Sequence, residues 1–544
     1  MRPGVLLALA ACLLPVLSVS ALAAEVRVII DTARDVWPIS PYVYGSNAHG
    51  GDAEANVAAV RFGGNRTTGY NWETNYSSAG NDWRHSSDDY LVQDLPEERR
   101  REPAIVVRLF HEQAVALRAA DLVTLQMAGY VAADNRRDVS EAETAPSARW
   151  KRVDFKKLAP FSLVPDTRDD AVYMDEQVNF LVNRYGQAAE GGVQIYSLDN
   201  EPAIWPNTHP RIHPQPVTCD ELVQRSIALA RAVKDVDPTA RVSGPALYGW
   251  TAFESLQNAP DWDVYKEKYD DWFINFYLDR MRQAEERYGV RLLDLLDVHW
   301  YPEARVGGLR ITTSRRAGDP AMMRERMHAP RTLWDEGYQE SSWIGQWHHP
   351  VRLLPRLQEN IRDYYPGTLL AITEHNYGGE GDVSGAVAHA DFLGLCGKHG
   401  VYMANRWGPL RGYVLSAYRI FRNYDGRNST FGETSVHAET SDPAETSAYA
   451  SLDGGGRLHL VLINKRLDEP AAFDIECRHA AALGRAEFYV VDGLGAAVRR
   501  PEPPTDIAGN RLTYAAPPAS VSHLVLSGAG QAAEPSLAPL PAGG

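Results

Sequence analysis

Cysteine is scarce in this sequence, with 4 residues among 544. Cys12 lies in the apolar N-terminal segment, and Cys219, Cys396 and Cys477 are widely spaced, with no Cys-x-x-Cys pair among them. An odd and scattered set of this kind predicts neither a disulfide framework nor a thiolate zinc site. We therefore expect the burial of apolar side chains to stabilise the fold.

Long basic runs are missing as well. Asp and Glu number 70 against 55 Lys and Arg, which gives a formal net charge of −15. Nucleic acids and anionic membranes are recognised by clustered basic side chains, so the sequence predicts neither partner. A neutral or weakly charged ligand fits better, and we expect the chain to act as a monomer.

Long apolar runs are absent beyond the N-terminus. There, residues 5–17 are apolar, Arg2 precedes them, and the small-residue sequence Ala-Leu-Ala follows at 21–23. This pattern predicts a secretory signal peptide over residues 1–24; the alternative is a lipid-attachment site at 9–12, although the residues after Cys12 remain apolar. No later segment approaches the ~20 apolar residues that span a bilayer. We therefore predict a secreted protein, extracellular or periplasmic.

Several catalytic motifs are also absent. His111-Glu112 is not followed by the second His of a zinc-protease helix, Gly397-Lys398 lacks the upstream glycine of a phosphate-binding loop, and no Gly-x-Ser-x-Gly elbow occurs. The sequence therefore assigns no residues to a catalytic metal.

What is present is a series of eight short apolar runs that end in polar or glycine-rich sequence. They lie at 42–47, 58–65, 122–135, 193–202, 241–249, 295–302, 369–379 and 401–408, with helical patterns between several of them at 110–120, 171–186, 219–236, 271–289 and 386–400. Eight such units predict an α/β chain with a (β/α)8 TIM barrel over residues 41–425, whose reactive groups follow the strands. A doubly wound open sheet alternates in the same way and is the alternative.

The pattern changes after residue 425. The segments 445–465, 471–478, 485–493 and 521–528 alternate as strands, with no helical pattern between them. They predict a second, smaller all-β sandwich domain over residues 426–528. The N-terminal segment 25–40 contains a strand with no place in the barrel, and we expect it to join the sandwich. Residues 529–544, rich in Ala, Pro and Gly, are predicted to form a disordered tail.

Two glutamates end runs of this barrel pattern. Glu201 lies in Asp-Asn-Glu-Pro after the fourth run, and Glu374 follows Leu-Leu-Ala-Ile-Thr in the seventh. In a closed barrel these strand ends face one another across the mouth. Glycosidic hydrolysis uses such a pair, one carboxyl protonated and one ionised, and a gap of about 5 Å predicts retention of configuration whereas a larger gap predicts inversion. An ordinary strand-ending turn is the alternative for Glu201.

Polar and aromatic residues near the same strand ends can complete a sugar site. Arg61 and Tyr301 are candidates to hold Glu374 ionised, with a structural ion pair or a core position as the alternative. Because sugars bind to aromatic faces and amide groups, the substrate-binding candidates are Asn200, Arg61, Asn47, Asn71, Trp72, Tyr301, Trp347 and Trp407. Several of the 13 Trp must be core residues, so we expect only part of this set to line the cleft.

The sequence resembles glycoside hydrolase family 44. The resemblance is carried, in the family's order, by RFGGNRTTGYNWE (61–73), SAGNDW (78–83), TLQMAGYVAADN (124–135), SLDNEP (197–202), DVHWYPE (297–303), TEHNYGG (373–379) and AYRIFRNYDGRNSTFGETSV (417–436). It implies a barrel with a sandwich built from both chain ends, and retaining endo-β-1,4-glucanase activity that often includes xyloglucan. It further implies Glu201 as acid/base, Glu374 as nucleophile, no cofactor for catalysis, and a structural calcium ion in some members, for which no position here is assigned.

Two positions depart from the family pattern. His375 follows the nucleophile position where the family is expected to have Tyr, and Thr74 to Ser77 replace a more Asn-rich run. Either change can alter subsites or pH dependence. The same mechanism acting on xylan or mannan is one alternative function, and a non-catalytic polysaccharide-binding protein is another.

Overall fold

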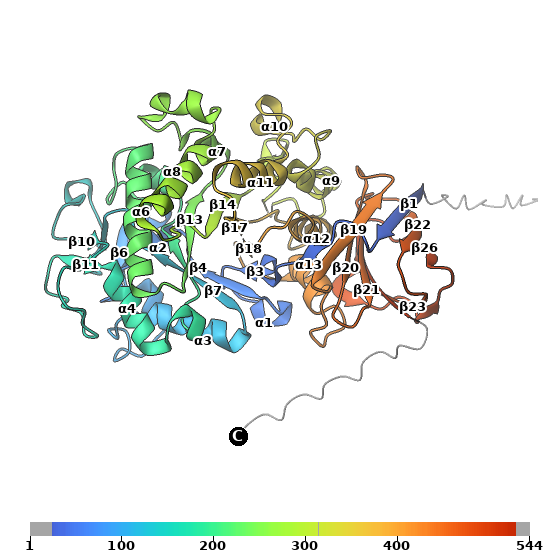
Figure 1. Ribbon diagram of the computed structural model, residues 1–544, viewed down its shortest axis with the longest axis horizontal. Helices are drawn as coiled ribbons and strands as arrows, with labels where there is room; N and C mark the ends of the chain where they lie inside the picture. The colour runs from blue at the N-terminus through green and yellow to red at the C-terminus, as the bar shows by residue number, and fades with distance from the viewer. Residues whose placement is uncertain (1–23, 314, 529–544) are drawn as a thin grey trace, which may run out of the picture.

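The fold is built around a closed barrel of parallel strands. The structure, a computed structural model, describes residues 24–313 and 315–528 (Figure 1). The predicted signal peptide, apart from Ala24, and the predicted tail 529–544 lie outside the described residues. The barrel strands, in chain order, are β3 (Gly45–Ser46), β4 (Ala59–Phe62), β7 (Ala120–Leu125), β12 (Ile195–Leu198), β13 (Arg241–Leu247), β14 (Leu295–Trp300), β17 (Leu369–His375) and β18 (Met403–Arg406). Since β3 pairs with β18, the sheet closes, and the barrel prediction is confirmed over the open sheet.

Helices surround this barrel. The long ones are α3 (Ile105–Leu117), α4 (Met174–Tyr185), α6 (Cys219–Val236), α8 (Phe273–Tyr288), α11 (Leu353–Tyr364), α12 (Val383–Lys398) and α13 (Gly412–Arg422). The short ones are α1 (Asp52–Ala55), α2 (Asn65–Thr68), α5 (Trp205–Thr208), α7 (Trp250–Ser255), α9 (Pro320–His328) and α10 (Trp343–Trp347). α6 begins where the Thr218 side chain accepts a hydrogen bond from the Glu221 N–H, the usual helix N-cap. Among the described residues, no helix has the length and apolar character needed to cross a membrane.

The second domain is a sheet of 11 strands that packs against the barrel. Its strands are β1 (Ala24–Asp31), β2 (Trp37–Pro38), β19 (Thr434–Thr440), β20 (Thr446–Leu452), β21 (Leu458–Asn464), β22 (Ala471–Arg478), β23 (Leu483–Asp492), β24 (Gly495–Arg499), β25 (Thr505–Asp506), β26 (Arg511–Ala516) and β27 (Ser520–Gly528). β1 pairs with β19 on one side and β22 on the other, so this N-terminal strand lies inside the sheet formed by the C-terminal ones (Figure 1).

α12 and α13 lie between the barrel and this sheet (Figure 1). α12 is buried from Val383 to Gly397, as expected for a helix made mostly of small and apolar residues. The facing strand β21 is likewise buried on both faces: Leu460 and Leu462 join the core of the second domain, while Val461 and Ile463 join the core shared with the barrel. This double burial explains why residues 460–463 of β21 are apolar without alternation.

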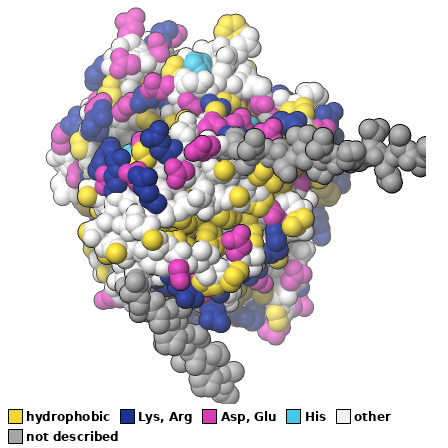
Figure 2. All heavy atoms as spheres, turned by 90° about the vertical axis from the view of Figure 1, so that its right-hand side faces the viewer, with side chains coloured by type: hydrophobic (Ala, Val, Ile, Leu, Met, Phe, Trp, Pro, Cys, Tyr) yellow, Lys and Arg dark blue, Asp and Glu magenta, His cyan; other side chains and the backbone are white. Residues whose placement is uncertain are grey.

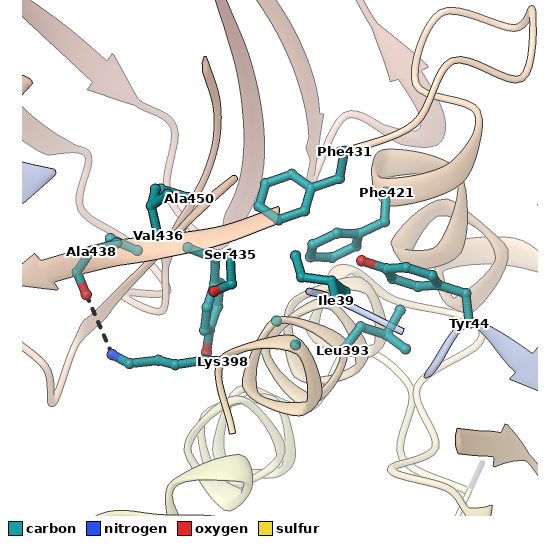
Figure 3. A pocket seen from close by; sticks show the side chains of 14 residues that line it. Ile39, Tyr44, Leu393, Lys398, Phe421, Phe431, Ser435, Val436, Ala438 and Ala450 are labelled. Carbon is teal, nitrogen blue, oxygen red and sulfur yellow. Dashed lines mark hydrogen bonds between the residues drawn. The ribbon is translucent and has the colours of Figure 1, made fainter. Parts of the chain in front are cut away.

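A small cavity remains at this domain boundary (Figure 3). Ile39, Leu393 and Phe421 line it from the barrel side, and at its edge the Lys398 ammonium donates to the Ala438 carbonyl at 3.3 Å. None of the described residues that line the cavity has a carboxyl side chain, so we interpret the cavity as a gap left by the packing of the two domains. On the end of the molecule seen in Figure 2, acidic and basic side chains are intermixed, so neither sign of charge dominates this end.

Small sheets extend the loops that follow the second, third and sixth barrel strands. One contains β8 (Tyr130–Ala132), β10 (Trp150–Asp154) and β11 (Ala171–Tyr173); a second contains β5 (Ser77–Ser78), β6 (Ser86–Asp88) and β9 (Arg137–Asp138); β15 (Arg305–Val306) and β16 (Leu309–Arg310) form a hairpin. The third apolar run of the sequence, 122–135, is therefore two strands, β7 and β8, separated by a turn at Gly129, whose φ is 112°. The sheet of β8, β10 and β11 covers the loop after α2.

Candidate active site

The two glutamates meet at the barrel mouth. Glu201 follows β12, and Glu374 is the penultimate residue of β17. One carboxylate oxygen of each, together with the His299 Nδ1, lie within 4.8 Å of one another. Glu201 is 14% exposed and Glu374 is 7% exposed, so both carboxyls lie in a largely water-excluded site that still has an opening.

The turn that presents Glu201 is held by the buried carboxylate of Asp199. Asp199 and Glu201 both have positive φ, 63° and 46°, a region that non-glycine residues rarely adopt. The Asp199 carboxylate accepts hydrogen bonds from Thr68 Oγ1 at 2.6 Å and from the N–H groups of Met127 at 2.5 Å, Ala128 at 3.0 Å and Asn200 at 2.8 Å. The loops after β4, β7 and β12 are thereby joined, and this network compensates for the strained turn.

Glu374 is surrounded by hydrogen-bond donors. Arg61 Nη1 donates to it at 2.7 Å and the Tyr301 hydroxyl donates to it at 2.6 Å. Burial alone raises the pKa of Glu374, but the charges of His299 and Arg61 and the hydrogen bond from Tyr301 outweigh burial and hold the pKa below its ordinary value. Glu374 is therefore ionised at neutral pH.

Glu201 has a different environment. Among the described residues, its one side-chain donor is His299, whose Nδ1 lies 2.8 Å from Glu201 Oε1 and 3.7 Å from Glu374 Oε2. Burial raises the pKa of Glu201, and the negative charge of Glu374 adds to this rise, while the hydrogen bond and charge of His299 oppose it. The two carboxyls are thus driven apart in pKa, which is the arrangement of an acid and a nucleophile.

His299 is a site residue that the sequence patterns did not indicate. It is fully buried on β14, and its pKa is raised because the carboxylates of Glu374 and Glu201 outweigh the opposing effect of burial. Strand alternation could have indicated it: His299 lies two residues before the predicted site residue Tyr301, so both side chains point to the same side of the chain. Asp297, two residues earlier, accepts a hydrogen bond from Thr373 Oγ1 at 2.8 Å and joins β14 to β17 below the site.

Three of the predicted substrate-binding residues form the polar base of the site. Besides Glu374, the Arg61 guanidinium donates to Asn47 Oδ1 at 3.1 Å and to Asn200 Oδ1 at 2.7 Å. All three side chains are almost fully buried, at 1%, 5% and 2% exposure for Arg61, Asn47 and Asn200. Their position fits a role in orienting the carboxyls.

Two other predicted sugar contacts are wrong because they are core residues. Trp72 is fully buried and packs against Phe180, and the fully buried Asn71 donates to the Ala132 carbonyl at 2.9 Å. The sheet that contains β8 covers their loop. Two tryptophan candidates do keep free surface: Trp407, which is half-buried after β18, and Trp347, which is 73% exposed on α10.

Trp407 is positioned by close packing. Its ring lies edge-on to His49, with 4.7 Å between ring centroids, and it contacts Gly64, where a Cβ would collide with the ring. Gly64 also has φ 91°, so this position requires glycine on both grounds. The indole ring is therefore held next to the loop that follows β4.

His375, the departure from the family pattern, faces away from the mouth. It is fully buried and stacks on Phe392 of α12, with 3.9 Å between ring centroids. Burial lowers its pKa well below the ordinary histidine value, so the ring is neutral. Since neighbouring residues of a strand point to opposite faces, His375 cannot contact a sugar at Glu374.

Among residues 24–313 and 315–528, one group of three metal-ligand side chains lies close enough together to hold an ion: Glu201, His299 and Glu374. The Arg61 guanidinium already contacts Glu374 and opposes a second cation there. The structural calcium that the resemblance implies needs about six to eight oxygen ligands, and this group does not supply them.

Comparison with known proteins agrees with this geometry. The sequence model of glycoside hydrolase family 44 matches residues 76–304. Endoglucanase A of Paenibacillus lautus is 49% identical over 519 residues, which cover 94% of this chain and 73% of that protein. A Beta-mannanase/endoglucanase A of Caldicellulosiruptor saccharolyticus is 45% identical over 92% of this chain, which spans only 39% of that longer protein.

A solved structure extends the similarity to the whole fold. The Paenibacillus polymyxa xyloglucanase of glycoside hydrolase family 44 is 49% identical, with a TM-score of 0.89 over 93% of this chain and 100% of that one; it has also been solved with xyloglucan. On these grounds the chain belongs to glycoside hydrolase family 44.

Proposed function

We propose that this enzyme cleaves internal β-1,4 bonds of glucans by double displacement with retention of configuration, Glu374 acting as nucleophile and Glu201 as acid/base. The observation that carries the proposal is the short separation of two carboxyls in opposite environments, with oxygens within 4.8 Å. Retaining enzymes place their carboxyl groups about 5–5.5 Å apart, whereas inverting enzymes leave about 6.5–9.5 Å for a water molecule.

In the first step, an ionised Glu374 oxygen bonds to the anomeric carbon while the bond from that carbon to the glycosidic oxygen breaks. The proton of Glu201 passes to the departing oxygen, so the leaving chain departs as a neutral alcohol. Arg61 and Tyr301, which donate to the two different oxygens of Glu374, fix the carboxylate plane before attack.

In the second step, Glu201 must act as a base. Once Glu374 is esterified, its negative charge is gone, and with it one of the causes that raise the pKa of Glu201. His299 continues to donate to Glu201 and favours the carboxylate. Glu201 then takes a proton from water, which attacks the anomeric carbon and releases Glu374.

The substrate we propose is a β-1,4-glucan, xyloglucan included. The relatives are named endoglucanase and xyloglucanase, and one is named Beta-mannanase/endoglucanase. Trp407 and Trp347 offer the free aromatic faces on which sugar rings stack. Release of reducing ends from carboxymethyl-cellulose, xyloglucan, glucomannan and xylan, measured in parallel, distinguishes this proposal from the mannan and xylan alternatives.

The mechanism is tested with Glu201→Ala and Glu374→Ala. We expect Glu374→Ala to lose activity by several orders of magnitude and Glu201→Ala to lose about 10²–10⁴-fold on polysaccharide. With an activated aryl glycoside, azide should partly restore Glu201→Ala and give a β-glycosyl azide. Glu359→Ala, which removes an α11 carboxyl paired with Arg352, is the control. An α-configured first product from the wild type, seen by NMR, would rule out retention.

We also propose export and a monomeric state. Polymeric glucan is outside the cell. Because β1 begins at Ala24, signal cleavage after residue 23 keeps the whole strand, and cleavage after residue 24 removes only its first residue. N-terminal sequencing of exported protein tests the cleavage site. Light scattering during gel filtration tests the monomer, and a mass of two or more chains would contradict it.

A further inference from the structure

An ammonium group lies at the centre of a cluster of oxygens away from the catalytic carboxyls. Lys151 Nζ is 2.8 Å from Glu73 Oε2, 3.0 Å from Asp169 Oδ1 and 3.4 Å from the Asp166 carbonyl oxygen. The side chains of Lys151 and Glu73 are 8% and 1% exposed, and that of Asp169 is 33% exposed. Two carboxylates and a backbone carbonyl thus surround one largely buried positive charge.

The cluster joins three separate parts of the chain. Glu73 lies in the loop after α2, Lys151 lies on β10, and the segment from Asp166 to Asp169 precedes β11. The neighbours of Glu73 include Asn71, whose side chain accepts from the Glu73 N–H. The cluster therefore fastens the loop after the second barrel strand to the sheet that covers it.

Carboxylates and backbone carbonyls that converge on one point are typical calcium ligands. The Lys151 ammonium fills that point here: calcium binds its oxygens at about 2.3–2.6 Å, so it cannot share the cluster with Nζ. Calcium does not fit while Lys151 is in place.

We infer that the Lys151 ammonium serves as a built-in cation in place of a structural calcium ion, so that this family member holds the loop after α2 without a metal. Two carboxylates face one ammonium, and water reaches the second of them, Asp169, whose side chain is 33% exposed. The inference concerns the fold alone, so it holds or fails independently of the catalytic roles of Glu201 and Glu374.

The electrostatics of the pair agree with this role. Burial raises the pKa of Glu73 to about 7, although the hydrogen bond and charge of Lys151 oppose the rise. Burial alone lowers the pKa of Lys151, but its hydrogen bonds and ion pairs to Glu73 and Asp169 outweigh burial and raise it. Lys151 therefore remains charged, and Glu73 depends on it for a partner.

The experiment compares thermal unfolding of the full chain in EDTA and in millimolar calcium chloride, with magnesium chloride as the ion control. We expect the wild-type melting temperature to be the same in all three. Lys151→Met removes the charge and keeps the apolar stem, and it should lower the melting temperature by several degrees. Lys156→Met, which removes an exposed lysine paired with Asp235, is the matched control and should change it little.

Lys151→Asp decides the matter even if Lys151→Met does not fold. With a third carboxylate in place of the ammonium, we expect this variant to melt at a higher temperature in calcium than in EDTA or magnesium, and to bind one calcium ion by calorimetry. A wild type that is destabilised by EDTA or stabilised by calcium overturns the inference. A Lys151→Asp variant with no response to calcium overturns it as well, as does a Lys151→Met variant as stable as Lys156→Met.

Discussion

Removing the Tyr301 hydroxyl should shift the acid limb of the pH–activity profile. That hydroxyl donates to Glu374 Oε2 at 2.6 Å and stabilises the ionised carboxylate, whose pKa is held below the ordinary glutamate value. Tyr301→Phe keeps the ring and deletes one donor, so the pKa of Glu374 should rise. Since the proposed mechanism requires ionised Glu374, the acid limb of kcat/KM should move to higher pH.

The size of the shift follows from the strength of the bond. A hydrogen bond to a charged group contributes about 1.5–3 kcal/mol, and each pH unit corresponds to about 1.36 kcal/mol. The expected displacement is therefore about one to two pH units. We place it at the lower end, because Arg61 Nη1 still donates to the other oxygen and because water can reach part of the vacated position.

The assay is initial-rate hydrolysis of a soluble β-glucan between acid and neutral pH, with melting temperatures measured at each pH. The control is Tyr185→Phe, which removes a similar hydrogen bond, from Tyr185 to Glu112 at 2.7 Å, on the outside of the barrel. An acid limb that stays in place in a folded Tyr301→Phe variant, or that moves equally in Tyr185→Phe, refutes the reasoning.

Three further predictions concern the same site. In the wild type, kcat/KM should have a bell-shaped dependence on pH, with an acid limb below the ordinary glutamate pKa of about 4.3 and a basic limb above it. The reason is that the pKa of Glu374 is lowered and that of Glu201 is raised. A profile with a single limb would contradict the two roles. Asp199→Asn places an NH₂ group against N–H donors, so the turn that carries Glu201 should shift, and kcat should fall about 10–100-fold with little change in KM. An unchanged kcat would show that the hydrogen bonds of the Asp199 carboxylate are not needed to position Glu201. Trp347→Ala should raise KM for polysaccharide about five-fold, the equivalent of about 1 kcal/mol, and leave the melting temperature unchanged because the side chain is 73% exposed; equal KM values would remove Trp347 from the binding cleft.

The strand ends were predictable because barrel strands carry a repeated local signal. Each is a short apolar run that stops at a polar or glycine-rich turn, and both Glu201 and Glu374 lie at such stops. Loop burial has no comparable signal. Asn71 and Trp72 sit in a sequence rich in amide and aromatic residues, yet the sheet of β8, β10 and β11 covers them. That sheet is assembled from segments far apart in the chain, so local patterns do not reveal it.

α11 and the boundaries of α12 illustrate a second limit. The sequence patterns gave no helix over Leu353–Tyr364, where Pro355 lies in the first turn, a position that tolerates proline. α12 was predicted over 386–400 and spans Val383–Lys398. Its start is set by Asp382, whose side chain accepts from the Ser384 N–H, a cap that is hidden within a run of small residues.

The roles of the two glutamates depend on an asymmetry that neither sequence segment contains. Both carboxyls end barrel strands, both are largely buried, and both are close to His299. Glu374 accepts additional hydrogen bonds from Arg61, which comes from β4, and Tyr301, which follows β14, whereas Glu201 accepts one side-chain hydrogen bond, from His299. Because each donor on a carboxylate favours its ionised form, the closure of the barrel favours Glu374 as the proposed nucleophile, and it favours the remaining carboxyl, whose pKa is raised by that neighbouring charge, as the proposed acid.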